Sequence, residues 1–143
     1  MLNAQRRIVI DRPADQVFAF FTDPVNDSNW RPHVREISAR GPIGVGSTIH
    51  QIVEGPGHRG IAADMKVVTY EPSRRYAFQV TAGPVRPAGE FLFSPSGNGT
   101  EVTFSLHAEL SGIKRLAMSR PVQKSMEGEM AALDQAKALL ERS

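Results

Sequence analysis

Residues 8–32 read IVIDRPADQVFAFFTDPVNDSNWRP, and this stretch changes twice from one local structural preference to another. Its first three residues are β-branched, which indicates a strand. Pro13 follows where a helix tolerates proline, at the first helical position, because the missing N–H is not needed there. Asp23 and Pro24 repeat this signal for a second, shorter helix. The stretch therefore predicts a strand followed by two helices that end near Trp30.

After Trp30 the hydrophobic pattern alternates with a period of two, and segments rich in glycine and proline interrupt it. Short connections of this kind make neighbouring strands antiparallel. Together with the strand that ends at Ile10, six further strands give a predicted seven-stranded sheet. They are expected near residues 34–40, 47–54, 61–70, 74–82, 89–94 and 100–110.

The alternation also divides this sheet into an apolar face and a wet face, because successive side chains point to opposite sides. A long helix from Ile113 to Arg142, interrupted or kinked by Pro121, can cover the apolar face. Its apolar stripe contains Val122, Met126, Met130, Leu133, Lys137 and Leu140, whereas Glu127, Glu129, Asp134 and Glu141 lie mostly elsewhere. The pattern predicts an α+β fold in which a sheet and a C-terminal helix share a core.

Composition limits the classes of function. At 143 residues, the chain fits one domain over residues 1–143, large enough to bury a substantial core. The net charge of +2 is scattered along the chain, which argues against a nucleic-acid partner. No apolar run reaches the roughly 20 residues of a membrane span, so only transient membrane contact is allowed. The absence of cysteine and of a leader-like start predicts a cytoplasmic protein.

The order of these elements resembles the START-like (SRPBCC) superfamily, and the residues are most similar to its polyketide cyclase/dehydrase branch. The resemblance spans essentially the whole chain and agrees with the pattern-based interpretation at every level. The matching pieces are Arg12-Pro13-x-x-x-Val17-Phe18, Asn26-x-x-x-Trp30-x-Pro32, Gly44-x-Gly46-Ser47, Val67-x-x-Tyr70-Glu71-Pro72, Gly99-Thr100-Glu101-Val102-Thr103 and the terminal Leu139-Leu140-Glu141.

This resemblance implies a helix-grip fold, in which a seven-stranded antiparallel sheet wraps around the long C-terminal helix and two short helices follow the first strand. It also implies a hydrophobic cavity between sheet and helix for a lipid, quinone, polyketide or similar molecule. Members of the superfamily include carriers, receptors, cyclases and chaperone regulators. Because one fold serves many chemistries, the fold does not choose among them.

Large apolar side chains on the expected inner surface are the candidate ligand-binding residues. Aromatic rings and methionine thioethers suit an irregular apolar pocket, although the same residues also serve as ordinary core packing. The candidates are Trp30, Phe78, Phe91, Phe93, Phe104, Met126, Met130 and Leu133.

Two polar residues on one strand are the candidates for proton transfer. His50 and Glu54 share a face with Thr48 and Ile52, and Ile49, Gln51 and Val53 occupy the opposite face, so the pattern leaves the direction of the pair open. Facing inward, the pair could act as general acid or base; exposure at the surface is the preferred interpretation. By the same argument, His107 and Asp64 are expected to point at solvent.

No metal site and no cofactor are predicted, because the four histidines lack metal-ligand spacing and no phosphate-cradling glycine loop precedes a helix. The leading hypothesis is a monomeric or homodimeric protein that binds a small hydrophobic or amphipathic molecule. One alternative is a polyketide cyclase or dehydratase that uses the same cavity. The other is a protein-interaction module, which would require an exposed apolar patch.

Overall fold

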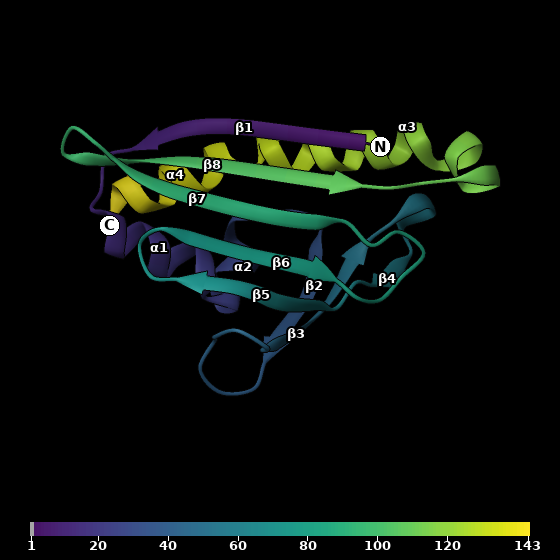
Figure 1. Ribbon diagram of the computed structural model, residues 1–143, viewed down its shortest axis with the longest axis horizontal. Helices are drawn as coiled ribbons and strands as arrows, with labels where there is room; N and C mark the ends of the chain where they lie inside the picture. The colour runs from purple at the N-terminus through teal and green to yellow at the C-terminus, as the bar shows by residue number, and fades with distance from the viewer. Residues whose placement is uncertain (1) are drawn as a thin grey trace.

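The computed structural model describes residues 2–143, and its elements follow the predicted order (Figure 1). In chain order they are β1 (Leu2–Ile10), α1 (Ala14–Thr22), α2 (Pro24–Trp30), β2 (Val34–Ala39), β3 (Thr48–Glu54), the short 3-10 helix η1 (Pro56–His58), β4 (Gly60–Ala62), β5 (Met65–Glu71), β6 (Arg75–Val80), β7 (Ala88–Ser96), β8 (Gly99–Ala108), α3 (Gly112–Ala131) and α4 (Leu133–Arg142).

The strands form a curled antiparallel sheet in the order β1-β8-β7-β6-β5-β3-β2, and the short β4 pairs with β3 outside this path. In Figure 1, α3 and α4 run along the sheet beside β1 and β8, and α1 and α2 lie toward the end where α4 terminates. The predicted α+β architecture, seven antiparallel strands around a C-terminal helix with two short helices after the first strand, is confirmed.

Residues 8–32 fold into a strand and two helices as predicted, but α1 begins one residue later than expected. Pro13 occupies the N-cap position of α1 and not its first turn. Asp23 caps α2 as expected, because its carboxylate accepts the N–H of Val25 at 3.1 Å. The Arg12 side chain donates to the main-chain oxygens of Glu141 and Ser143. The link between β1 and α1 therefore holds the end of α4.

The predicted strand over residues 61–70 is divided into β4 and β5, which corrects the expectation of one continuous strand. Asp64 lies between the two and replaces the missing backbone pairing with its side chain. Its Oδ1 accepts the N–H of Gln51 at 3.3 Å, and its Oδ2 lies 2.9 Å from Nδ1 of His50. The segment between β4 and β5 stays attached to β3, because the N–H of Ala63 also donates to the Gln51 carbonyl at 2.9 Å.

The sequence predicted that Pro121 interrupts or kinks the C-terminal helix, but α3 continues through this residue. Pro121 is exposed like Ala117, so water can satisfy the carbonyl group of Ala117 that loses its N–H partner. The two helices α3 and α4 meet at Ala132, whose backbone is helical and whose N–H donates to the Gly128 carbonyl at 3.1 Å. Beside this junction, Arg6 of β1 donates to the Met130 carbonyl at 3.0 Å and pairs with Asp134 at 2.6 Å.

The apolar face of the sheet is the face that the alternation assigned inward. An aromatic cluster fills the end next to α1: the rings of Phe91 and Phe104 stack at 4.1 Å, and Phe21 lies 5.0 Å from Phe91 and 5.4 Å from Trp30. All are buried. Among the described residues, no helix has both the length and the apolar character of a membrane span.

Substitution of Gly89 by alanine should destabilise the protein, because Phe78 lies directly across from it in the β6–β7 register. A Cβ atom at position 89 would stand 2.3 Å from Cζ of Phe78, so the ring must move. We expect a loss of about 1–3 kcal/mol in the free energy of unfolding, measured by urea denaturation. Gly44→Ala is the control, since its Cβ meets no atom within 4 Å. Equal stability of the two variants would contradict this account.

Candidate functional site

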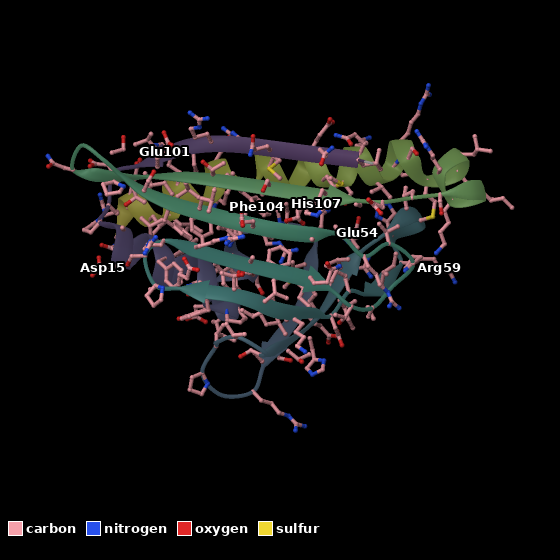
Figure 2. All side chains as sticks on the ribbon, viewed as in Figure 1. Asp15, Glu54, Arg59, Glu101, Phe104 and His107 are labelled. Carbon is pink, nitrogen blue, oxygen red and sulfur yellow. The ribbon has the colours of Figure 1, made fainter. Side chains whose placement is uncertain are left out.

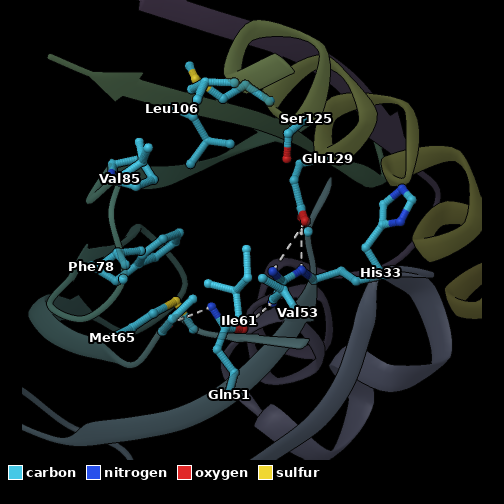
Figure 3. Close-up of a pocket in the computed structure, with 18 of the residues that line it drawn as sticks. His33, Gln51, Val53, Ile61, Met65, Phe78, Val85, Leu106, Ser125 and Glu129 are labelled. Atoms are coloured by element: carbon cyan, nitrogen blue, oxygen red, sulfur yellow. Dashed lines mark hydrogen bonds and ion pairs between the residues drawn. The ribbon is translucent and has the colours of Figure 1, made fainter. Parts of the chain in front are cut away.

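A cavity of about 510 Å³ lies between the curled sheet and helices α2 and α3 (Figure 3). Most of its wall is apolar and comes from strands β3 to β8 and from the inner side of α3. This apolar wall includes Phe21, Trp30, Ile49, Val53, Ile61, Met65, Phe78, Val80, Val85, Phe91, Phe104, Leu106, Met118, Val122 and Met126. A mostly apolar wall of this kind is typical of cavities that bind small molecules.

One part of the wall is charged, and Arg31 is its centre. Its Nε donates to Oε2 of Glu129 at 2.8 Å, and one terminal nitrogen donates to Oε1 of the same carboxylate at 3.3 Å. The other terminal nitrogen donates to Oδ2 of Asp27 at 3.0 Å and to Oε1 of Gln51 at 3.1 Å. The dashed lines in Figure 3 mark these contacts at Glu129 and Gln51. We call these four residues the Arg31 network.

Three elements far apart in the sequence supply the network. Asp27 and Arg31 are spaced i, i+4 across the end of α2, and the Arg31 N–H also donates to the Asp27 carbonyl at 2.8 Å. Gln51 extends from β3, and its Nε2 donates to the Ala63 carbonyl at 2.9 Å. Glu129 reaches in from α3. The side chains of Asp27, Arg31 and Glu129 are only 12%, 11% and 17% exposed. Their contacts are therefore screened weakly by solvent.

Burial acts in opposite directions on the pKa values of Asp27 and Arg31, although both pKa values are raised overall. Burial raises the pKa of Asp27 from 3.8 to about 6, and the charge of Glu129 adds to this, although Arg31 opposes both. For Arg31, burial alone would lower the pKa, but the nearby carboxylates of Glu129 and Asp27 raise it above its ordinary value. The arginine thus stays charged, and Asp27 titrates close to neutral pH.

Two polar groups outside the network face the same region: the indole N–H of Trp30 and the hydroxyl group of Tyr76. Asp27 Oδ1 and Trp30 Nε1 are buried and have no hydrogen-bond partner among the described residues. The indole N–H lies close enough to lower the pKa of Asp27, without the alignment that a hydrogen bond requires. The Tyr76 side chain lines the cavity, and burial raises the pKa of its hydroxyl, so the group stays protonated.

The structure places five of the eight candidate ligand-binding residues in the cavity wall: Trp30, Phe78, Phe91, Phe104 and Met126. The other three are buried in the core away from it. Phe93 packs at 5.2 Å against Phe18 of α1, and Met130 and Leu133 lie toward the α4 end of the C-terminal helix. Phe18 of α1 packs at that end of the sheet, and Phe21 of α1 forms part of the cavity wall.

The two proton-transfer candidates lie apart from the Arg31 network. The His50 side chain is 57% exposed, pairs with Asp64 and does not line the cavity. Glu54 lines the cavity, where its carboxylate contacts Nδ1 of His58 at 3.0 Å and Arg35 at 3.5 Å. The hydrogen bond from His58 lowers the pKa of Glu54. In Figure 2, His107 is labelled on β8, where it is exposed like His50.

The sequence interpretation did not identify the Arg31 network, although two signals were present. Gln51 shares its face with Ile49 and Val53, which marks it as an inward polar residue. Asp27 and Arg31 have the i, i+4 spacing of a helical ion pair. Glu129 was expected off the apolar stripe, but its side chain reaches the cavity. Within residues 2–143, no group of three or more acidic, histidine or cysteine side chains could hold a metal ion.

A curled antiparallel sheet that closes over a cavity with a C-terminal helix is the helix-grip architecture. The sequence profile of one family, described as polyketide cyclase / dehydrase and lipid transport, matches residues 1–141, and the chain belongs to this family. No curated protein matches the chain significantly by sequence.

Solved structures with low sequence identity share the fold. TTHA0849 from Thermus thermophilus has a TM-score of 0.78 at 21% identity, over 97% of this chain and 95% of that one. Ara h 8.0201 has a TM-score of 0.75 at 10% identity, over 99% and 98% of the two chains. The di-domain ARO/CYC StfQ from the steffimycin biosynthetic pathway has a TM-score of 0.79 at 14% identity, over 99% of this chain and 51% of that chain. At these identities the likeness establishes the fold alone.

The raised pKa of Asp27 predicts a pH-dependent contribution to stability. Because the folded protein binds this proton more tightly than the unfolded chain, the wild type should gain stability relative to Asp27→Asn as the pH falls through the range from 6 toward 3.8. Between pH 7.5 and pH 5, the difference in unfolding free energy between the two proteins should shift by about 1 kcal/mol in favour of the wild type. Urea denaturation of both proteins at both pH values measures this shift. A stability difference that does not change with pH, or that changes in favour of Asp27→Asn at pH 5, would refute the raised pKa of Asp27.

Proposed function

We propose that this protein binds a small, largely apolar molecule that carries one polar group, within the cavity between the sheet and α3. The observation that carries the proposal is the combination of a cavity of about 510 Å³ with a mostly apolar wall and a buried charged group, the Arg31 network. Ligand sites commonly have volumes of roughly 300–1,000 Å³ and a few placed polar groups. The apolar wall supplies affinity, and the Arg31 network orients the bound molecule.

The distribution of packing supports this proposal. Core aromatic side chains interlock at the α1 end of the sheet, where Phe18, Phe21 and Phe93 lie against one another. Protein interiors normally contain few voids larger than a water molecule. A space of this volume next to such a well-packed cluster is therefore a feature that function explains better than folding does.

The family and its structural relatives are consistent with a ligand of this kind. The family description includes both polyketide chemistry and lipid transport, and StfQ is named as an ARO/CYC protein of a biosynthetic pathway. We infer that this chain shares the use of the cavity, and that carriage of a ligand is its basic activity.

Filling the cavity should abolish binding without unfolding the protein. Ser125 lines the cavity from α3, and Figure 3 shows its side chain on the same inner side as Glu129. We expect wild-type protein to enhance the fluorescence of N-phenyl-1-naphthylamine, an uncharged apolar probe, in a saturable manner. Ser125→Phe should weaken this binding by at least about tenfold, because the added ring occupies the probe's space.

The matched control is Lys124→Phe, which adds the same ring at the neighbouring exposed position that does not line the cavity. This variant should bind the probe like the wild type. Circular dichroism should show that both variants remain folded. Absence of saturable binding to the wild type, or equal binding to all three proteins, would count against the cavity as the binding site.

Proton transfer within the cavity is a second candidate function, and one observation favours it. Asp27 lines the cavity with a pKa raised to about 6, which suits a group that accepts a proton near neutral pH. We propose dehydration of a β-hydroxy ketone as the reaction class. The Asp27 carboxylate removes the proton next to the carbonyl, and the C–O bond to the hydroxyl group then breaks as the carbon–carbon double bond forms. The departing hydroxide takes the proton back from Asp27, which gives water, a conjugated enone and the regenerated carboxylate.

Conversion of 4-hydroxy-4-phenylbutan-2-one to its enone, followed by absorbance, tests this second function. Catalysis by the wild type should fall by about 100-fold or more in Asp27→Asn, the usual scale for loss of a positioned general base. Asp15→Asn, at an exposed position on α1, is the control and should retain the full rate. A wild-type rate no faster than buffer, or an unchanged rate in Asp27→Asn, would exclude Asp27 as the base.

A further inference from the structure

Buried arginines often bind the carboxylate of a ligand, but Arg31 is already occupied. A guanidinium has five N–H groups, and a carboxylate is held best by two of them in parallel. Arg31 makes four hydrogen bonds to protein oxygens, of which two go to Glu129, one to Asp27 and one to Gln51. A ligand carboxylate could bind in the same two-pronged way only by displacing one of these residues.

The charges of the network also disfavour a bound carboxylate. It contains one cation, Arg31, and two carboxylates, Asp27 and Glu129, all with side chains less than one-fifth exposed. With both carboxylates ionised, the polar region of the cavity carries a net negative charge. A ligand anion placed there would be repelled in surroundings that screen charge poorly.

The network and its surroundings keep free hydrogen-bonding capacity of both kinds, including the acceptor Oδ1 of Asp27 and the donor Nε1 of Trp30. Each Glu129 oxygen receives one hydrogen bond, and a carboxylate oxygen can accept more than one. Tyr76 is 4% exposed, lines the cavity and makes no hydrogen bond to any other described residue. Its protonated hydroxyl can both donate and accept. A neutral hydroxyl group on a ligand could donate to the carboxylates and accept from Tyr76.

We propose that the cavity selects apolar molecules that carry a neutral hydroxyl group, a phenol or an alcohol, and discriminates against carboxylates of the same size. This inference rests on the proposed ligand-binding function and specifies its ligand class. The hydroxyl group lies at the Arg31 network beside Tyr76, and the apolar body extends along the wall formed by the sheet and α3.

A matched set of three ligands tests this selectivity with the full chain at pH 7.5. 9-Phenanthrol, 9-methoxyphenanthrene and phenanthrene-9-carboxylate share one ring system and differ in charge and in the ability to donate a hydrogen bond. Titration calorimetry should give a dissociation constant for the phenol at least about tenfold lower than for the carboxylate, with the ether weaker than the phenol. A carboxylate that binds as tightly as the phenol overturns the proposal.

Glu129→Gln makes the test specific to the network. Loss of this negative charge leaves Arg31 balanced by Asp27 alone, so the carboxylate should bind at least about tenfold more tightly than to the wild type, and the phenol should change by less than about threefold. Glu127→Gln removes the same charge from an exposed position on α3 and should leave all three affinities unchanged. Asp27→Asn removes one negative charge from the network on α2. It replaces Glu129→Gln in this test if thermal melting shows that Glu129→Gln is unfolded.

The outcomes separate this inference from the function on which it rests. If all three ligands bind with comparable affinity, the cavity is still a binding site, but the proposed selectivity for a hydroxyl group is wrong. An unchanged preference in Glu129→Gln overturns the role of the network. Failure of every ligand, together with the absence of N-phenyl-1-naphthylamine binding, overturns both proposals.

Discussion

The guanidinium of Arg31 is the interaction on which the site depends, because it joins α2, β3 and α3 inside the protein. A buried charge is tolerated only when its hydrogen bonds are satisfied, and here two carboxylates and an amide provide them. Removal of Gln51 or of one carboxylate would leave at least one N–H group of the buried guanidinium without its partner. The network thus fixes the distance between α3 and the sheet, and with it the width of the cavity.

The cavity and the core are two ends of one apolar surface. At the α1 end, aromatic side chains from the helix fill the curve of the sheet, and Phe91 and Phe104 stack against each other there. Toward the other end, α3 contributes smaller and more flexible side chains, such as Met126 and Val122, and the interior is not filled. Phe21, Phe91 and Phe104 lie where the packed core meets the cavity, because they belong to the aromatic cluster and also line the cavity wall.

The fold could be predicted from the sequence because its signals are local. Alternation along β6 to β8 assigned Tyr76, Phe91 and Phe104 to the buried side, and the proline signals located α1 and α2. The features that could not be predicted depend on side chains that meet across long sequence separations. Arg31 and Glu129 are 98 residues apart, and Arg6 of β1 contacts the Met130 carbonyl from 124 residues away. Between β4 and β5, the Asp64 carboxylate accepts the N–H of Gln51, a contact that alternation does not predict.

The contact of Arg6 with the Met130 carbonyl has a mechanical consequence. It attaches the C-terminal helical segment to β1 near the junction of α3 and α4, and Arg12 attaches the end of α4 to the β1–α1 link. Residues from the start of the chain therefore hold the C-terminal helical segment at two points along its length. The position of α3, which forms one wall of the cavity, thus depends in part on the first strand.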